Sequence, residues 1–510
     1  MKKRFILSLL FLSTTFLVSC NNTKPITTAK EGNVLLDIIE INDLHGYANE
    51  ASKTEGYNLA NINYYIEEKR QKENNEVILI ANGDMFEGTA FSGSSLGLST
   101  LNIMNQMNFD MMGIGNHEFS WGLDSILKFF DNNKENGEAN FPLVNGNIYS
   151  SDKRYGEDDI NDNILPYTIV EKDDIKVGLI SYIGNIASSI AEDKLENFKI
   201  KASNSFFKSQ VVEDCNNLKK QGADFIIFNI HGGNANSIDD YDINNIVAEL
   251  KDENGNYYID AIINGHTHSR QSSIKKRGKN KLPMVQGGSY CDNFGEIVLE
   301  IDKGKMEVVD ASSSVIKTSS LKENNKDNKV QTQIDIEYDK IKDSIDKIYC
   351  NNKYTISREN LGLLFAKELR IGTSADLSIM NTGGIRASLP SGNITYSTIY
   401  DSYPFENHIV CLKVKGIYLN DWIEQEKDYY YMDYEIDSFD YYTIYNVTTI
   451  DYVFESSYFK NIIKSYEVIA ISNTLTPRDF FINDLENRGN TDFSIYDTIK
   501  VTVKGFGDLD

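Results

Sequence analysis

The chain has 510 residues, 41% of them hydrophobic, and a formal net charge of −24 at pH 7. This length is enough for two or three domains with buried cores. The negative charge excludes a general attraction to nucleic acid or anionic lipid, so an anionic substrate needs a local positive centre, which a bound metal ion would supply.

Residues 1–20 have the pattern of a secretory signal, with a basic start, a short apolar stretch and small residues before Cys20. The stretch is too short for a stable membrane span. The LVSC ending resembles a bacterial lipoprotein signal, which implies that Cys20 is lipidated and becomes the mature N-terminus; the alternative is a plain cleaved signal. Residues 21–33 are polar and aperiodic, and we expect a flexible tether to an exported, lipid-anchored protein that faces the periplasm or the cell exterior.

Residues 34–316 alternate apolar, strand-like runs with helical patterns, the latter for example at 57–70, 123–133 and 203–219. The strand-like runs are LLDIIEIND, EVILIANGD, FDMMGIGN, IKVGLISYI, ADFIIFNIH and YIDAIINGH. Fully apolar strands between helices are typical of βαβ units whose sheets are covered on both faces. The sequence therefore predicts an α/β catalytic domain over 34–316.

Five short polar motifs follow these apolar runs and contain five of the six histidines of the chain. The motifs are DLHG at 43–46, NGD at 82–84, GNHE at 115–118, NIHGG at 229–233 and NGHTH at 264–268. Each motif alone is weak, since a lone histidine is more often structural than a ligand. Ligands of α/β folds collect at the carboxyl ends of strands, so all five motifs together predict one site.

The motifs supply seven or eight candidate ligands of aspartate, asparagine and histidine type. This mixed oxygen and nitrogen set favours Zn, Mn, Fe or Co over Ca or a thiolate-dependent metal. The number of ligands exceeds what one tetrahedral ion needs. Two divalent metal ions that share a bridging carboxylate fit the number.

Beyond this domain, residues 317–350 are predicted to be a linker and a helix, because 317–329 is charged and 330–348 has apolar residues at helical spacing. Residues 351–510 are predicted to form a second domain of mixed α and β character. After Cys20, the four cysteines are widely spaced without a CxxC motif. The sequence is compatible with one disulfide among these four cysteines or with four free thiols.

The order DxH, GD, GNHE, H, GHxH resembles the calcineurin-like metallophosphoesterases, and more closely the bacterial and animal 5′-nucleotidases. The segments VQGGSY at 285–290, NTGGIR at 381–386 and PFENHIV at 404–410 support that branch. The resemblance covers nearly the whole mature chain. It implies a four-layer αββα metallophosphoesterase sandwich followed by a smaller α+β C-terminal substrate domain.

The same resemblance implies a role for each motif residue. One ion would be held by Asp43, His45 and His268. The second would be held by Asn116, His231 and His266, and Asp84 would bridge the two. Together the ions would activate a water molecule, bind phosphate oxygens and align the phosphorus atom.

His117 would be the catalytic residue that stabilises developing charge or protonates the leaving group. The family pattern usually continues GNHEFD, and its Asp orients this histidine. Here Ser120 occupies that place, with Glu118 and Asp124 nearby in sequence. We expect an intact metal site and a less strongly poised His117.

The C-terminal domain of the family holds the nucleoside. The implied substrate contacts are Arg358, Asn381, Arg386, Phe405, Asn407 and Tyr452, of which Phe405 and Tyr452 would stack on the base. The spacing around Arg358 departs from the family by one residue. A glycine-rich GGDG turn with a ribose-binding Asp is replaced by FESSYF at 454–459, which puts ribose recognition in doubt.

The expected function is therefore dimetal-dependent hydrolysis of phosphate monoesters, and of 5′-nucleotides in particular, with no nucleic-acid partner. A cyclic-nucleotide phosphodiesterase, a nucleotide-sugar hydrolase or another phosphoesterase is the enzymatic alternative. A surface binding protein that has lost turnover is the alternative of a different class.

Overall fold

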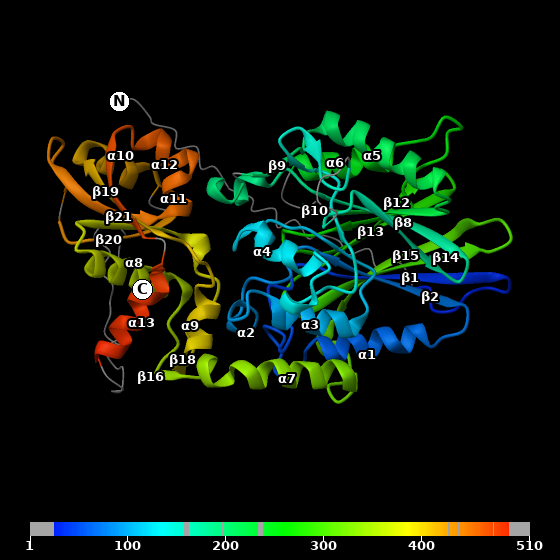
Figure 1. Cartoon of the computed structure of the whole chain (residues 1–510), viewed down its shortest axis with the longest axis horizontal. Helices are drawn as coiled ribbons and strands as arrows, with labels where there is room; N and C mark the ends of the chain where they lie inside the picture. Colours follow the sequence, from blue (N-terminus) through cyan, green and yellow to red (C-terminus); the bar gives the residue numbers. More distant parts are fainter. Residues whose placement is uncertain are drawn as a thin grey trace, which may run out of the picture.

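The computed structural model describes residues 25–157, 163–195, 197–232, 238–426, 429–436, 438–472 and 474–488. Figure 1 shows a larger N-terminal domain, blue to green, beside a smaller C-terminal domain, yellow to red, with helix α7 (Asn328–Ile345) along one edge. Cys20 lies outside the described residues. No helix within these ranges is long and apolar enough to cross a membrane.

Two six-stranded sheets form the centre of the N-terminal domain. The first sheet has the order β15 (Glu307–Lys317), β14 (Asn293–Asp302), β1 (Asn33–Ile41), β2 (Asn75–Asn82), β3 (Met111–Gly113) and β4 (Leu143–Val144). The second has the order β12 (Arg270–Arg277), β13 (Asn280–Gly287), β11 (Ala261–Asn264), β10 (Phe225–His231), β8 (Ile175–Ile183) and β7 (Tyr167–Lys172). A small sheet of β5 (Ile148–Ser150), β6 (Lys153–Arg154) and β9 (Lys199–Ile200) lies beside them.

The apolar runs of these strands are buried on both faces. Leu36 and Ile38 of β1 pack between the two sheets with Leu179 of β8, whereas Ile39 and Ile41 point to the opposite face. The outer face of the first sheet packs against α1 (Leu59–Arg70), α3 (Leu98–Met107) and α7. The outer face of the second packs against α5 (Asn204–Lys220) and α6 (Ile238–Ala248). The predicted four-layer αββα sandwich is confirmed.

The helix that was predicted for the linker packs with the first domain. Val330 and Ile334 of α7 belong to the same core as Leu59 and Ile62 of α1. The helix begins at Asp327, whose carboxylate accepts the N–H groups of Lys329 and Val330. The chain then enters β16 (Ile348–Asn352), which pairs with β18 (Gly392–Thr395) of the second domain.

The C-terminal domain is built on a five-stranded sheet. Its order is β20 (Tyr430–Tyr434), β17 (Leu377–Asn381), β21 (Ile444–Ile450), β19 (Ile409–Lys415) and β22 (Tyr466–Ser472). Helices α8 (Arg358–Thr373) and α13 (Pro477–Arg488) cover one face, and α10 (Gly416–Glu426), α11 (Asp451–Glu455) and α12 (Ser457–Ile462) cover the other. The predicted α+β character of this domain is confirmed.

The two domains touch where α9 (Tyr396–Ser402) packs against α2 (Ala90–Gly93). The Ala90 N–H group donates to the Asp401 carboxylate at 3.0 Å. The sequence left open one disulfide or four free thiols. All four cysteines of the described ranges are free thiols, so they form no disulfide with one another.

Candidate metal centre and active site

Five loops that follow strands bring the sequence motifs together at one edge of the two sheets. The first sheet supplies Asp43 and His45 after β1, Asp84 after β2 and Asn116 after β3. The second sheet supplies the remaining side chains, which are His231 at the end of β10 and His266 and His268 after β11. Parallel strands end at the same edge, so residues far apart in sequence converge there.

Five of these seven side chains are carried on left-handed backbone. The φ angles are 49° at Asp43, 50° at His45, 53° at Asp84, 76° at His266 and 55° at His268. Residues with a Cβ atom rarely adopt this conformation, and it concentrates at sites where the surrounding structure enforces it. The turns therefore hold these ligand candidates in place at some conformational cost.

One group of potential ligands consists of Asp43, His45 and His268. The Nε2 atoms of the two histidines are 3.1 Å apart, and His268 Nε2 is 3.5 Å from Asp43 Oδ1. Burial lowers the pKa of His45 well below its usual range and that of His268 to about 3. Both imidazoles are therefore neutral and have a nitrogen lone pair available for an ion.

A second group consists of Asp84, His231 and His266, with Asn116 beside it. Asp84 Oδ2 is 3.1 Å from His231 Nε2 and 3.8 Å from His45 Nε2 of the first group. His266 Nδ1 lies 2.9 Å from Asn116 Oδ1. Asp84 thus lies between the two groups, and it is the residue for which the resemblance implies a bridging role.

The hydrogen bonds of His231 show that these donors fit a cation. Its Nδ1 atom is 2.7 Å from the Asn82 carbonyl, which can only accept, so Nδ1 carries the proton. Its buried Nε2 atom faces Asp84 Oδ2 at 3.1 Å and Asp43 Oδ1 at 3.8 Å, and without a proton it makes no hydrogen bond to the described residues. Burial lowers the pKa of His231, but Asp84 and Asp43 raise it to about 10. A bare nitrogen that faces two carboxylates requires a proton or a metal ion between them.

The loop around Asp84 is fixed by Glu118 and by a close backbone approach. The Glu118 carboxylate accepts the N–H groups of Asp84, Met85 and Gly115 at 2.7–2.8 Å. A Cβ atom on Gly115 would lie 2.3 Å from Asp84 Oδ1, so only glycine fits there. Glu118 therefore supports the Asp84 turn.

His117 is held by a carboxylate that the sequence analysis did not identify. Its Nδ1 atom is 2.6 Å from Glu87 Oε2, and Ser120 Oγ donates to the same oxygen at 2.5 Å. Ser120 Oγ is 3.4 Å from the His117 ring nitrogen, a much weaker contact. Burial lowers the pKa of His117, but Asp84 and Glu87 raise it above its usual value. His117 thus has a carboxylate partner, Glu87, in addition to its weak contact with Ser120.

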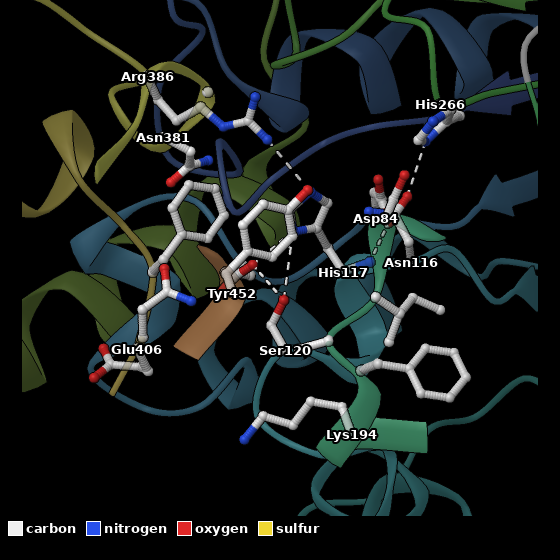
Figure 2. A pocket seen from close by; sticks show the side chains of 18 of the residues that line it. Asp84, Asn116, His117, Ser120, Lys194, His266, Asn381, Arg386, Glu406 and Tyr452 are labelled. Atoms are coloured by element: carbon white, nitrogen blue, oxygen red, sulfur yellow. Dashed lines mark hydrogen bonds and ion pairs between the residues drawn. The ribbon is translucent and has the colours of Figure 1, made fainter. Parts of the chain in front are cut away.

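A cavity of about 440 Å³ opens beside His117 and is lined by both domains. Figure 2 shows Asp84, Asn116 and His266 to one side of His117, with Asn381, Arg386 and Tyr452 on the other. In the same view Lys194 lies below Ser120, and Glu406 lies at the left, below Asn381; both line the cavity. Four of the seven metal-ligand candidates and five of the six predicted nucleoside contacts thus line one cavity.

Arg386 and Phe405 bring the C-terminal domain into contact with His117. Arg386 Nη2 is 3.4 Å from His117 Nε2 and its guanidinium lies 5.1 Å from the centre of the Phe405 ring. The Phe405 and His117 rings are stacked, with centroids 5.8 Å apart. A guanidinium donor beside a metal cluster is suited to phosphate oxygens.

Four further predicted contacts differ in how they face the cavity. Tyr452 is 37% exposed and lines the cavity, as does Asn381, whose Oδ1 atom has no partner among the described residues. Asn407 also lines it, but its amide already bonds Tyr403 and Asp451. Arg358 is not a lining residue, because its guanidinium donates to the Ile385 carbonyl and supports the loop that carries Arg386.

Residues 454–459, where the resemblance implies a glycine-rich turn, are part of two short helices. Residues 454–459 span the end of α11 and the start of α12, with Ser456 as the N-cap of the second helix. The preceding Asp451 lines the cavity and accepts the His408 N–H group. Sequence reasoning missed Glu87, Asp451 and Lys194, which have no motif of their own and are identified only by their position.

Two family sequence models match the chain. The calcineurin-like phosphoesterase model matches residues 36–270, and the 5′-nucleotidase C-terminal domain model matches residues 340–457. Among solved structures, the 5′-nucleotidase precursor of Thermus thermophilus superposes with a TM-score of 0.70 at 16% identity, covering 90% of this chain and 97% of that one. At this identity the superposition supports the fold alone.

Two curated relatives add to this. The endonuclease YhcR of Bacillus subtilis is 26% identical over 81% of this chain, which spans only 35% of that protein's length. The 5′-nucleotidase of Vibrio cholerae is 25% identical over 76% of this chain and 75% of its own length.

Proposed function

We propose that this chain releases phosphate from 5′-nucleotides. It belongs to the calcineurin-like phosphoesterases with a 5′-nucleotidase C-terminal domain and is a metal-dependent phosphoester hydrolase. The observation that carries the proposal is the shared cavity: a cluster of ligand candidates and a pair of aromatic side chains face it from opposite domains. This arrangement suits a substrate that has a phosphate at one end and a planar base at the other.

Two divalent ions, of Zn, Mn, Fe or Co type, fit the donor set. Asp43, His45 and His268 would hold one ion; Asn116, His231 and His266 would hold the other; Asp84 would contact both. When bound, such ions supply a water of lowered pKa as nucleophile and neutralise phosphate oxygens.

The side chains around the cluster would orient the phosphate and handle a proton. Arg386 Nη2 and His117 Nε2 lie 3.4 Å apart and point at the same region, so a phosphate oxygen could replace their mutual contact. His117 Nε2 would then stabilise charge on the phosphate or transfer a proton to the leaving oxygen. Phe405 and Tyr452 would stack on the base, and Asn381 would donate or accept at its edge.

A phosphodiesterase acting on cyclic nucleotides or a nucleotide-sugar hydrolase is the second candidate. Residues 454–459, where the resemblance implies a glycine-rich turn, form the end of α11 and the start of α12, which favours a changed ribose site. The same metal site would serve either reaction, so the two functions have to be distinguished by a comparison of substrates.

The test is phosphate release by purified residues 21–510 loaded with Mn or Zn. The substrates are AMP, a cyclic nucleotide and an aryl phosphate, and we expect AMP to have the highest kcat/KM. Hydrolysis of the aryl ester without AMP hydrolysis would reject the nucleotidase proposal. A metal-loaded chain that hydrolyses none of the three would instead be a binding protein.

We also propose that Cys20 is lipidated and anchors the exported chain to a bacterial membrane. The support is the basic, apolar and small-residue order of residues 1–20. Labelling with a radioactive fatty acid should mark the wild-type chain and not Cys20→Ser. Equal labelling of the wild type and Cys20→Ser would contradict lipidation at Cys20.

A further inference from the structure

We propose that Glu87 is the positioning residue of His117, whereas the family resemblance implied a carboxylate at the position of Ser120. The inference rests on the proposed function, since His117 has a chemical role only in phosphoester hydrolysis. It assigns the carboxylate to the turn after β2 instead of the segment that carries His117 itself.

The contacts of the Glu87 carboxylate support this assignment. The side chain is 1% exposed, and its Oε2 atom receives both His117 Nδ1 at 2.6 Å and Ser120 Oγ at 2.5 Å. The other oxygen, Oε1, has no hydrogen-bond partner among the described residues. Its interactions are therefore directed at the imidazole and at the hydroxyl that aligns it.

These contacts determine which ring nitrogen of His117 carries the proton. A carboxylate accepts and does not donate, so Nδ1 carries a proton. In the neutral ring the Nε2 lone pair then faces the cavity, and Nε2 is the site of the second proton that the charged ring can transfer. Arg386, which can only donate, approaches Nε2 at 3.4 Å and agrees with that tautomer. Charge-assisted hydrogen bonds of this kind are stronger than neutral ones, and the orientation they impose is correspondingly firm.

Glu87 also orients a metal-ligand candidate through its main chain. Its carbonyl oxygen lies 2.8 Å from His45 Nδ1 and so directs His45 Nε2 towards the cluster. A Cβ atom on the next residue, Gly88, would lie 2.5 Å from the His45 carbonyl, so this turn is packed tightly against His45. Glu87 thus contacts His117 through its side chain and the metal-ligand candidate His45 through its main chain.

Two other acidic side chains near His117, Asp84 and Glu118, do not serve this role, since Asp84 accepts the main-chain N–H group of His117. Glu118, adjacent in sequence, accepts three backbone N–H groups and supports the Asp84 turn. Among the residues that the structure describes, Glu87 is the carboxylate bonded to His117 Nδ1. The hydroxyl of Ser120 already donates to Glu87, which makes Ser120 a support for the carboxylate.

The experiment moves the carboxylate from one position to the other in the full chain. Glu87→Gln should lower kcat for a nucleoside monophosphate about 100-fold or more, which is the usual contribution of a positioned acid or base. Adding Ser120→Asp to that variant should restore kcat to within about tenfold of the wild type. The metal content of both variants should equal that of the wild type, because the Glu87 carbonyl that orients His45 is retained.

Ser120→Ala is the matched control, because it removes one hydrogen bond and keeps the carboxylate. Its kcat should fall by less than about tenfold, as expected for one neutral hydroxyl. A loss as large as that of Glu87→Gln would overturn the proposal, as would a double variant that folds, binds metal and is not rescued. If Glu87→Gln alone did not fold, the double variant would decide in the same way.

A measurement on the unmodified protein provides a second readout. In 15N-histidine-labelled, Zn-loaded chain, the His117 ring should carry a proton on Nδ1 in both its neutral and its charged form, and a neutral ring protonated on Nε2 would overturn the proposal. The nucleotidase proposal is judged separately by wild-type activity on AMP. The variants are compared on whichever phosphomonoester the wild-type chain hydrolyses fastest.

Discussion

At the scale of single residues, Asp84 lies between the two groups of ligand candidates. It is 1% exposed, lies 3.1 Å from His231 Nε2, and accepts the His117 N–H group at 2.7 Å through its other oxygen. Burial raises the pKa of Asp84, but His231 and His117 hold it well below its usual range. The carboxylate is therefore charged and is the natural centre of the site.

Replacing this charge should disable metal binding and turnover together. Asp84→Asn keeps the size of the side chain, and we expect a lower metal content and a kcat reduced about 1,000-fold, the equivalent of about 4 kcal/mol. Elemental analysis and phosphate release measure the two effects. Asp173→Asn, an exposed partner of Lys303, is the control and should change neither. Activity that survived Asp84→Asn would contradict the two-ion proposal.

Glu40 is a buried acid whose surroundings favour its protonated form. It is fully buried in β1, neither carboxyl oxygen has a hydrogen-bond partner among the described residues, and the backbone of Gly295 packs against it. Burial, and then the charge of Asp43, raise the pKa of Glu40 well above its usual range. The folded chain therefore binds a proton that the unfolded chain releases near pH 4.3.

This raised pKa predicts a loss of stability as the pH rises. Its contribution is complete below the unfolded pKa and decreases as the pH climbs towards the folded pKa. Glu40→Gln cannot lose a proton, so its Tm should exceed that of the wild type at pH 8, by about 2–4 °C per kcal/mol recovered, with a smaller difference at pH 5. Calorimetry of EDTA-treated chains avoids a contribution from metal binding. A Tm difference independent of pH would contradict this account.

At the scale of elements, the sequence predicted most of what places the metal ligands. The apolar runs that end in DLHG, NGD, GNHE, NIHGG and NGHTH correspond to β1, β2, β3, β10 and β11. The helical patterns at 57–70 and 203–219 correspond to α1 and α5. Periodicity sufficed there because burial on both faces of a sheet leaves a plain apolar pattern.

The pairing of Glu87 with His117 could not be predicted in this way. The two residues lie in separate turns, and their distance depends on left-handed backbone at Asp84 and on the short 3-10 turn His117–Phe119. Neither feature has a periodic signal. Family resemblance pointed to position 120 for the carboxylate, whereas the structure has the carboxylate at position 87.

The contact between α2 and α9 sets the position of the substrate-facing loop. A Cβ atom on Gly93 would lie 2.0 Å from Tyr400 Oη, and Tyr400 is only 2% exposed. Helix α9 leads directly into the segment that carries Phe405. A side chain at position 93 would therefore displace α9 from α2 and shift Phe405 relative to His117.

Gly93→Ala should accordingly weaken nucleotide binding more than the chemistry of a small substrate. We expect KM for AMP to rise about tenfold or more, with a smaller change in kcat for an aryl phosphate, because misplacement by about 1 Å can reduce rates up to 100-fold. Gly304→Ala is the control, since the nearest atom to its Cβ would be 3.3 Å away in an exposed turn. Equal kinetics for both variants would show that α9 does not position the loop.

At the scale of the whole molecule, the site is divided between two domains with separate cores. The metal-ligand candidates belong to the N-terminal domain, and Asn381, Arg386, Phe405 and Tyr452 to the C-terminal domain. Helix α7 contributes Val330 and Ile334 to the N-terminal core although it leads to the second domain. The first domain is therefore complete only when α7 is retained.

This division predicts different results for two truncations. A chain of residues 25–347 should fold, bind metal and hydrolyse an aryl phosphate, but lose its preference for AMP because the base and phosphate contacts of the second domain are gone.

A chain that ends at residue 327 also lacks Val330 and Ile334, and its Tm should be lower by about 10 °C, since each side chain contributes about 1.5–3 kcal/mol on burial. Metal analysis, Tm measurement and the ratio of kcat/KM for the two substrates test both chains. An unchanged preference for AMP in the longer truncation would place nucleotide recognition in the first domain, and equal Tm values would place α7 with the second.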